Sequence, residues 1–458
     1  MRFFHVYDFF LVPICLIVLF MVLKSRANKN RDPWVKNIYF KAFYFKIFCV
    51  LAFALISEFL FEGGDTNLYY QGVKDLRAAI NADGNILPSL LTVEKLEENS
   101  PMAPFFFYDG YADDITYNYM LAPANFFVPR LGVFPSLIFA NSYLCICFCF
   151  AFFALGGAIR IFKMFYYYYP GFKRELAIAI LFLPSVGFWS AGLLKDTICF
   201  GCVGFILYGV FKIFVKKEKY LPSAFWILLC SYILYTVKPY IFLVLLLGIV
   251  IWVFSETNKL IKDRTLRWIF GILTFGTGLI AGFFLLQYFT SQETLRQYEF
   301  ENILSSAEFQ RKNYQLIDEY AKGQSSYYSV NTSNPFLMIV NGIVATFFRP
   351  FPWEISSAAA LLSAVESLAF LILTAYLFIK KGIATPFALI FKDSRALFCF
   401  VFAIVFAIGI GAATANFGAL SRYKIPCMPF YLVMLILVYR SAGLAYPKWF
   451  QKIAGLIK

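Results

Sequence analysis

Histidine is almost missing from this chain, since His5 is the only one and lies at the edge of the first apolar run. A metal site built from histidines and a histidine general base are therefore excluded. The long polar segments 63–130 and 290–334 contain no cysteine, so no structural disulfide is expected. A glycine-rich nucleotide-binding loop is also missing, so the sequence gives no sign of a nucleotide-linked substrate.

Charged residues make up only 15% of the chain, whereas hydrophobic residues make up 60% and aromatic residues 21%. A soluble fold of 458 residues could not hide this much apolar surface. Apolar runs of about 20 residues recur along the chain, and each is long enough to cross a bilayer as a helix. The composition predicts an all-α, polytopic helical membrane protein in contact with membrane lipids.

Acidic residues are outnumbered by basic ones, which leaves a formal net charge of +14. In a soluble protein this excess would favour a nucleic-acid partner. In a membrane protein, basic residues collect in cytoplasmic loops and set the orientation of the spans. We therefore attribute the charge to membrane topology and expect no nucleic-acid partner.

The placement of lysine and arginine predicts how the chain threads the membrane. Arg2 alone precedes the first apolar run, 6–23, whereas Lys24, Arg26 and Lys29 follow it. This asymmetry puts the N-terminus outside and the first loop in the cytoplasm. The same rule, applied along the chain, predicts about 11 spans and a cytoplasmic C-terminus. The predicted spans are 6–23, 43–61, 131–161, 175–194, 197–215, 221–237, 241–254, 268–289, 356–379, 397–415 and 427–439.

The apolar segment 336–348 does not fit this alternation. If it crossed the membrane, every later basic loop would lie outside, so we expect one re-entrant or interfacial segment here. The expected organisation has five parts. They are 1–62, two N-terminal spans with a basic cytoplasmic loop; 63–130, a first extracytoplasmic loop domain with an interfacial helix; 131–289, central spans; 290–355, a second extracytoplasmic loop with the re-entrant segment; and 356–458, C-terminal spans and a cytoplasmic tail.

Several charged residues remain at the predicted outer ends of spans, where the positive-inside rule does not expect cations. Cations near an outer membrane face suit the phosphate or pyrophosphate of a lipid. For Arg422 and Lys424 the alternative is that both are interfacial cations whose aliphatic stems lie along lipid. The candidate phosphate-binding residues are Lys195, Asp196, Lys238, Arg349, Arg422 and Lys424.

Asp65 is the candidate catalytic residue. It follows two glycines at the exit of the second predicted span, and its carboxylate would accept a proton from an acceptor hydroxyl. The alternative is that Asp65 caps the helix that follows it. That interfacial helix is predicted from apolar residues at helical spacing, with charged residues on the other side. The apolar residues are Tyr69, Val73, Leu76 and Ile80, and the charged ones are Lys74, Asp75 and Arg77.

Three short pieces carry a resemblance to a known family: GGDTNLYY at 63–70, PSVGFWSAGLLKD at 184–196 and NFGALSRYKIPCMPF at 416–430. Together with the many spans, they make the chain similar to GT-C type membrane glycosyltransferases and related bacterial polysaccharide polymerases. In that family an acidic residue of the first outer loop acts as base or positions the acceptor, and Asp65 matches it. The family's basic residues hold the donor phosphate, and Arg422, Lys424 and Lys195 match them.

The resemblance implies an enzyme of the bacterial inner membrane that works in polysaccharide biosynthesis at the cell envelope. It would transfer a hexosyl group from a polyprenyl-(pyro)phosphate-linked donor to a glycan or lipid acceptor on the extracytoplasmic face. Two alternatives stay open: a transporter or flippase for a lipid-linked or anionic substrate, and a non-catalytic membrane scaffold. The sequence specifies neither the sugar, the acceptor nor the oligomeric state.

The family's paired acidic signature is absent, and Asp65 stands alone unless Asp113 and Asp114 supply a second carboxylate. These two residues lie in the stretch YDGYADDITYNY at 108–119. A carboxylate-bound Mg²⁺ or Mn²⁺ is one interpretation of the pair, and a tyrosine-rich loop structure explains it equally well. No metal-ligating residue is assigned, and no cofactor is otherwise expected.

Overall fold

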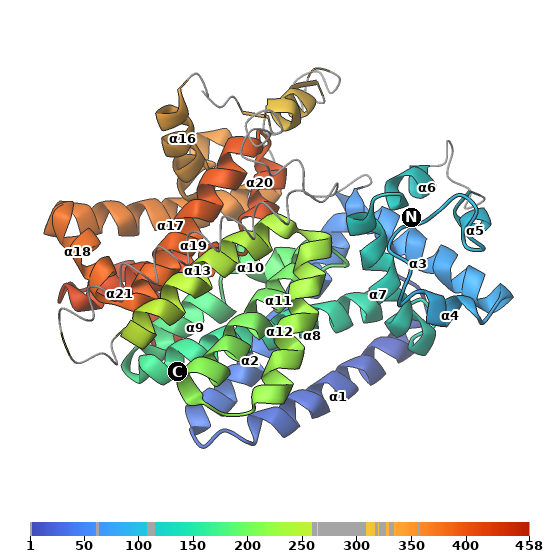
Figure 1. The fold of residues 1–458 in the computed structure, drawn as a ribbon, viewed down its shortest axis with the longest axis horizontal. Helices are drawn as coiled ribbons and strands as arrows, with labels where there is room; N and C mark the ends of the chain where they lie inside the picture. The colour runs from blue at the N-terminus through green and yellow to red at the C-terminus, as the bar shows by residue number, and fades with distance from the viewer. Residues whose placement is uncertain are drawn as a thin grey trace. The chain divides into compact units, whose positions relative to one another are not determined.

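The computed structural model describes residues 2–60, 64–107, 115–258, 263, 308–316, 319, 327–328, 334–355 and 358–457 (Figure 1). These residues are helical apart from turns, connecting segments and an antiparallel bridge between Tyr327 and Asn416. Within the described part, eight helices are long and apolar enough to cross a membrane, or nine if the bent pair α20–α21 is one span. The predicted polytopic helical architecture is thereby confirmed, whereas the count of about 11 spans stays a prediction.

Contacts divide the chain into two units, each built from segments that are separate in sequence. The first unit comprises Met1–Met164, Gly187–Gly209 and Leu221–Lys238. Four of its helices, α8, α10, α11 and α12, have one or more residues in the second unit. Its helices are α1 (Asp8–Ala27), α2 (Pro33–Phe59), α3 (Asp65–Ala82), α4 (Ile86–Ser89), α5 (Ala103–Phe107), α6 (Ile115–Met120), α7 (Pro123–Ile138), α8 (Tyr143–Tyr168), α10 (Pro184–Trp189), α11 (Lys195–Val210) and α12 (Tyr220–Val237).

The second unit comprises Phe165–Val186, Val210–Tyr220 and Pro239–Lys458. Besides α-helices it contains two 3₁₀ turns, η2 and η5, and a π-helical turn, η3, among the described residues. Its elements are η2 (Pro170–Phe172), α9 (Lys173–Leu181), η3 (Phe211–Lys216), α13 (Pro239–Asn258), α16 (Pro335–Phe348), η5 (Pro352–Glu354), α17 (Ala358–Lys381), α18 (Ala384–Lys392), α19 (Ser394–Ala413), α20 (Phe417–Tyr423), α21 (Met428–Ser441) and α22 (Lys448–Leu456).

Short polar side chains start several of these helices. Asp32 accepts a hydrogen bond from the backbone N–H of Trp34 at 2.8 Å at the start of α2. Asp393 does the same for α19, and Asn416 does so for α20. These side chains satisfy backbone N–H groups that have no partner within the helix, and in apolar surroundings such groups are costly to leave unpaired.

Most predicted spans have a counterpart in the structure. The predicted spans 6–23, 43–61, 197–215, 221–237, 241–254, 356–379, 397–415 and 427–439 correspond to α1, α2, α11, α12, α13, α17, α19 and α21. α21 is joined to α20 at an angle of 66°. Segment 336–348 forms α16, an apolar helix of 14 residues, shorter than the helices that could span a membrane. The predicted span 268–289 lies outside the described residues.

Two predicted spans are not single helices. Segment 131–161 forms the end of α7 and most of α8, which separate where Ala140 and Asn141 adopt positive φ angles of 48° and 63°. Segment 175–194 forms α9, α10 and a non-helical linker, because Pro184 disfavours the helical conformation of Leu183 before it. The prediction of one continuous helix was wrong for both segments. An uninterrupted apolar run can also be formed by two helices that change direction between them.

In the first unit, α11 and α12 form an antiparallel pair. A Cβ on Gly209, near the end of α11, would lie 3.2 Å from the carbonyl oxygen of Ser223 near the start of α12, and Phe205 lies against Trp226 with ring centroids 4.5 Å apart. The order of contacts along one helix is the reverse of the order along the other. The start of α11 and the end of α12 therefore lie at the same end of the pair, which brings their charged residues together.

Glycines allow two close helix crossings. A Cβ on Gly204 of α11 would lie 2.2 Å from the carbonyl oxygen of Gly157 on α8. In the second unit, a Cβ on Gly411 of α19 would lie 2.2 Å from the carbonyl oxygen of Gly342 on α16. Small residues at such crossings let the backbones approach, which is a common way to pack helices in membranes.

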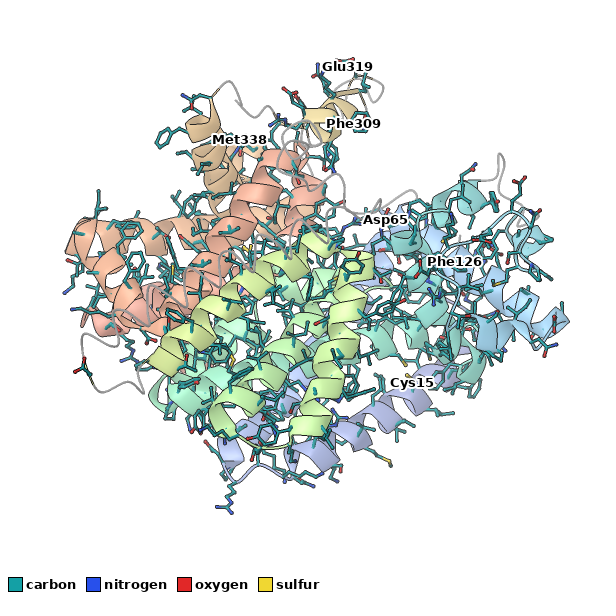
Figure 2. All side chains as sticks on the ribbon, viewed as in Figure 1. Cys15, Asp65, Phe126, Phe309, Glu319 and Met338 are labelled. Atoms are coloured by element: carbon teal, nitrogen blue, oxygen red, sulfur yellow. The ribbon has the colours of Figure 1, made fainter. Side chains whose placement is uncertain are left out.

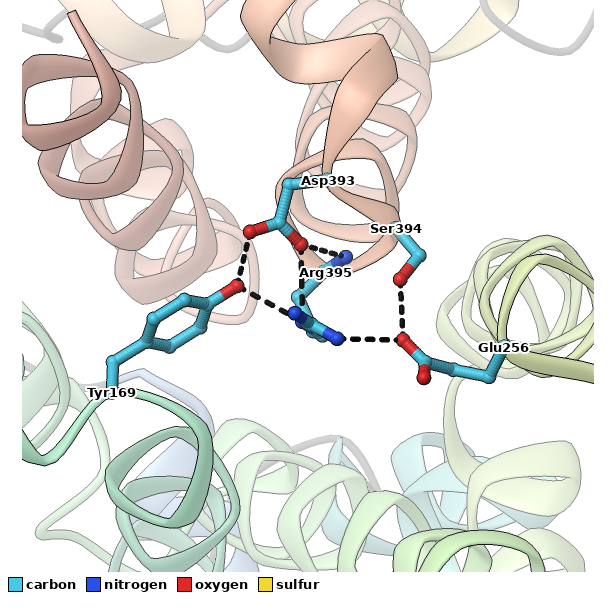
Figure 3. Close-up of polar contacts among 5 residues, drawn as sticks. All are labelled: Tyr169, Glu256, Asp393, Ser394 and Arg395. Carbon is cyan, nitrogen blue, oxygen red and sulfur yellow. Dashed lines mark hydrogen bonds and ion pairs between the residues drawn. The ribbon is translucent and has the colours of Figure 1, made fainter. Parts of the chain in front are cut away.

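A polar network joins the ends of three helices in the second unit (Figure 3). Arg395, at the start of α19, pairs with Glu256 at 2.8 Å and with Asp393 at 3.0 Å. Its Nε also donates to the Tyr169 hydroxyl at 2.9 Å, and Ser394 donates to Glu256. The positive-inside rule predicts all of these residues at the cytoplasmic side, and this orientation stays a prediction.

Gly411→Ala is predicted to destabilise the protein, because the backbone of α16 must move to admit a methyl group. Overpacking of this kind costs about 1–3 kcal/mol. Gly409→Ala is the matched control: it lies on the same helix, its Cβ would have no atom within 4 Å, and alanine favours helix. Thermal unfolding in detergent should give a lower midpoint for Gly411→Ala and an equal or higher one for Gly409→Ala. Equal midpoints for the two variants would contradict the close crossing.

Candidate functional site

Asp196 and Lys238 form a buried ion pair in the first unit. Asp196 lies in the first turn of α11 and Lys238 directly follows the last residue of α12; they are 1% and 7% exposed. Each charge is at the helix end whose partial charge favours it, the carboxylate at an N-terminus and the ammonium at a C-terminus. The turn predicted at 238–240 is confirmed as a break between α12 and α13 at Lys238. Lys195, the first residue of α11, is partly exposed.

A non-helical linker, 190–194, precedes this pair and is buried throughout. Its backbone depends on Lys46, a residue in the middle of α2 that is 8% exposed. The Lys46 ammonium donates to the carbonyl oxygens of Gly187 and Ser190 at 3.1 and 3.2 Å, and to the Ser190 hydroxyl at 2.7 Å. Thr197 donates to the Gly192 carbonyl at 2.7 Å. These donors satisfy carbonyls left without partners where α10 ends, and the carbonyls in turn stabilise the lysine charge.

Asp65 is the first residue of α3, and Gly64 before it has a φ of 107° (Figure 2). A carboxylate in the first turn of a helix interacts favourably with the helix dipole. This position supports the alternative in which Asp65 stabilises the start of α3. The predicted apolar face of α3 is confirmed, since Val73 and Leu76 are fully buried. Asp75 was predicted on the polar side, and this was wrong: it is buried and accepts a hydrogen bond from Gln71 at 2.8 Å.

Arg349 is the centre of a second group of candidate residues, in the second unit. Its guanidinium forms a forked ion pair with Glu354 and lies over the rings of Tyr328 and Phe417, 4.6 and 5.1 Å from their centroids. These two rings are themselves stacked, with centroids 4.3 Å apart. A planar guanidinium suits both contacts, and a lysine here would lose the fork and the stacking.

Lys424 lies at the break between α20 and α21 and is completely buried. Its ammonium donates to the backbone carbonyl of Arg349 at 3.1 Å and to the Ser367 hydroxyl at 3.0 Å. Ser367 in turn donates to the same carbonyl of Arg349 at 2.9 Å. Lys424 therefore fixes the backbone of Arg349, and its burial favours a positioning role over direct contact with a ligand.

Arg422 is half-buried beside tyrosines. Its guanidinium lies over the Tyr423 ring, 5.0 Å from the centroid, and Nη2 donates to the Tyr423 hydroxyl at 3.3 Å. Tyr314 interacts with Arg422, Tyr423 and Tyr328, so it links the surroundings of Arg422 to those of Arg349. Burial raises the pKa of the Tyr314 phenol, Tyr423 raises it further and Arg422 lowers it. Burial likewise raises the pKa of Tyr328, so both phenols stay protonated and able to donate.

The structure thus gathers the candidate residues into two groups. Lys195, Asp196 and Lys238 belong to the first unit, as does Asp65. Arg349, Arg422 and Lys424 form what we call the cationic cluster of the second unit. Asp113 and Asp114, the candidate second carboxylates, lie outside the described residues. Over the described ranges, no group of three or more Cys, His, Asp or Glu side chains is arranged to hold a metal ion.

Sequence reasoning missed several residues of these groups. Lys46 is a lysine inside an apolar window, and that signal alone could have marked it as a residue with a partner. Glu354 stands in the stretch FRPFPWE, five residues after Arg349, which is compatible with a local ion pair. Tyr314 and Tyr328 offered no signal, because each reaches the cationic cluster from a distant part of the chain.

No protein-family model, no curated protein and no solved structure matches this chain.

Lys238→Met is predicted to lower the free energy of unfolding by about 3–5 kcal/mol, because it leaves Asp196 buried without its counter-charge. Asp196→Asn should cost a similar amount, and the double variant should be more stable than the sum of the two losses. Denaturant unfolding in mixed micelles measures all three. Lys29→Met, at an exposed lysine, is the control and should unfold like the unchanged protein. Strictly additive single losses would mean that the two residues do not act as a pair.

Proposed function

We propose that the protein is a glycosyltransferase of the bacterial inner membrane that acts on the extracytoplasmic face. It takes a sugar from a polyprenyl-(pyro)phosphate-linked donor and transfers it to a glycan or lipid acceptor. The observation that carries the proposal is the cationic cluster, in which Arg349 meets the segment of Arg422 and the buried Lys424, and aromatic rings lie beside both arginines. This combination suits a sugar phosphate.

The arginines would bind the donor phosphate. A guanidinium presents two N–H groups in a plane, which matches two oxygens of a phosphate. Arg349 already makes this kind of contact with the Glu354 carboxylate, so its fork is oriented before an anion arrives. Arg422 is half-exposed and is the residue best able to contact a ligand directly. Lys424 would add positive charge beside Arg349 and hold the Arg349 backbone in place through the hydrogen bond to its carbonyl oxygen.

Aromatic rings would contribute the remaining contacts. Ligand pockets are lined mostly by apolar and aromatic side chains with a few placed polar groups. Tyr328 and Phe417 stack beside Arg349, and Tyr423 stacks beside Arg422. The phenols of Tyr314 and Tyr328 stay protonated and so add no negative charge near the phosphate, and the Tyr328 hydroxyl already donates to the carbonyl oxygen of Thr414 at 2.7 Å. Trp353 is 79% exposed four residues after Arg349, which suits the membrane interface where a lipid-linked donor arrives.

In the proposed reaction the acceptor hydroxyl attacks the anomeric carbon of the donor sugar. A new glycosidic C–O bond forms while the bond between that carbon and the phosphate oxygen breaks. The hydroxyl proton is taken up by a base, and Asp65 is the residue that the sequence proposes for this role. The departing polyprenyl (pyro)phosphate carries the negative charge, and Arg349 and Arg422 stabilise it. Asp196 and Lys238 neutralise each other, and we give them a positioning role.

Binding of a lipid phosphate tests the proposal most directly. The protein in lipid nanodiscs is titrated with a polyprenyl diphosphate, and binding is followed by native mass spectrometry. Arg422→Gln should weaken binding by about 10–100-fold, because one charge-assisted hydrogen bond is worth about 1.5–3 kcal/mol. Arg31→Gln, at an exposed arginine between α1 and α2, is the control and should bind as the unchanged protein does. Equal affinity of Arg422→Gln and the unchanged protein would overturn the assignment.

Asp65→Asn separates chemistry from binding. The variant should bind the polyprenyl diphosphate normally and lose transfer from a polyprenyl-diphosphate-linked sugar, because an amide cannot take up the hydroxyl proton. Asp83→Asn is the matched control, since Asp83 is exposed at the other end of the same helix. Full transfer activity in Asp65→Asn would remove Asp65 from the mechanism and leave the binding assignment to be judged by the arginine variants.

A further inference from the structure

A carboxylate that the proposed reaction does not use lies inside the second unit. Glu366 is 6% exposed and belongs to α17, eight residues after its first residue, Ala358. At the usual rise this is about 12 Å along the helix. The surrounding stretch, Leu361–Lys381, is apolar enough to cross a membrane. Ionisable groups in such positions are rare, costly and usually functional.

The two oxygens of the Glu366 carboxylate have different surroundings. Oε1 accepts a hydrogen bond of 2.7 Å from the backbone N–H of Ser185, at the start of α10. Oε2 is buried and accepts no hydrogen bond from any described residue. An ionised carboxylate has about four acceptor positions and is stabilised when they are filled. The Ser185 side chain also interacts with this carboxylate, but its hydroxyl makes no hydrogen bond to a described residue. Among the described residues the backbone N–H of Ser185 is thus the one donor at hydrogen-bond distance, which is too little for an ionised group at this burial.

The hydroxyl of Ser363, about one helical turn before Glu366, also lacks a hydrogen-bond partner among the described residues. Ser363 itself is only 1% exposed. Residues three apart are neighbours on one face of a helix, so Ser363 and Glu366 lie side by side on α17. A proton on Oε2 of Glu366 would satisfy both unpartnered oxygens, because the resulting O–H could donate to Ser363 Oγ.

A basic group lies near the carboxylate without touching it. The ammonium of Lys424 is close enough to Glu366 to interact electrostatically, yet no direct ion pair joins them in the described structure. Two of the three N–H groups of Lys424 donate to Arg349 and Ser367, which leaves the third for exchange. The other charges that pack against this end of α17 are Arg349 and Glu354, already paired with each other.

We propose that Glu366 is a buried proton-binding site, with the proton on Oε2 donated to Ser363 Oγ and exchanged through the neighbourhood of Lys424. The assignment rests on the unpartnered Oε2, the unpartnered Ser363 hydroxyl and the absence of a direct ion pair between described residues. The ligand is a proton, and the site is independent of any sugar chemistry.

Proton binding at Glu366 would be felt at two helix breaks. Glu366 holds the start of α10 through Ser185, and its electrostatic partner Lys424 occupies the break between α20 and α21. When the proton leaves, the new negative charge attracts the Lys424 ammonium away from the Arg349 carbonyl. Broken helices that meet at a titratable residue are the usual place where proton binding is linked to a change of shape in membrane proteins.

Infrared difference spectroscopy on the full-length protein in nanodiscs tests this directly. A protonated carboxyl group gives a C=O stretching band distinct from that of a carboxylate, and the band shifts in D₂O. We expect such a band at neutral pH and its loss as the pH is raised. Glu366→Gln should remove the band, and Ser363→Ala should move it because the hydrogen bond to Ser363 is gone. Glu98→Gln, at an exposed carboxylate of the first polar loop, should leave it unchanged.

Two results would overturn the proposal. If the spectrum of Glu366→Gln equals that of the unchanged protein, the carboxylate is ionised and serves only as a counter-charge for Lys424. If the band persists at every pH at which the protein stays folded, the proton does not exchange. Should Glu366→Gln fail to fold, Ser363→Ala decides the question, since an unmoved band excludes the proposed hydrogen bond.

Discussion

Where a helix ends inside apolar surroundings, its last carbonyls and first N–H groups have no water to bond, and the chain itself must supply partners. The ammonium of Lys46 supplies them at the end of α10, and Glu366 supplies one at its start. Lys424 does the same for the backbone at Arg349, beside another break. The broken segments and the buried charges therefore depend on each other, because neither would be stable in an apolar interior alone.

This dependence changes how the charges are interpreted. Lysines at outer ends of spans look like free ligands for an anion when only the sequence is seen, yet Lys238 has Asp196 and Lys424 has backbone and serine oxygens as partners. Arg349 and Arg422 also have partners, Glu354 and the Tyr423 hydroxyl, but a planar guanidinium can share its N–H groups between a protein acceptor and a phosphate. The cationic cluster is accordingly best understood as arginines positioned by a lysine.

The sequence predicted what depends on composition and on local pattern. Long apolar runs predicted most of the spans, and the gap between the runs 221–237 and 241–254 predicted the turn at Lys238. It failed where an apolar run is interrupted without charged residues, as at 139–142 and at Leu183, because hydropathy averaged over a long run does not register a change of backbone direction. It also could not bring Tyr314 and Tyr328 to the cationic cluster, since their contacts with Arg422 and Phe417 join segments far apart in sequence and follow only from packing.

The pair of Asp196 and Lys238 has a consequence for synthesis of the chain. The two residues are separated by 42 positions, and Lys238 is the last residue of the first unit. At a usual elongation rate the carboxylate emerges about 2–8 s before the ammonium. During this interval an aspartate at the head of an apolar helix has no counter-ion, so α11 would settle in the bilayer only together with α12. The two helices are then best regarded as one insertion unit, entering as a hairpin whose closing step is the formation of an ion pair.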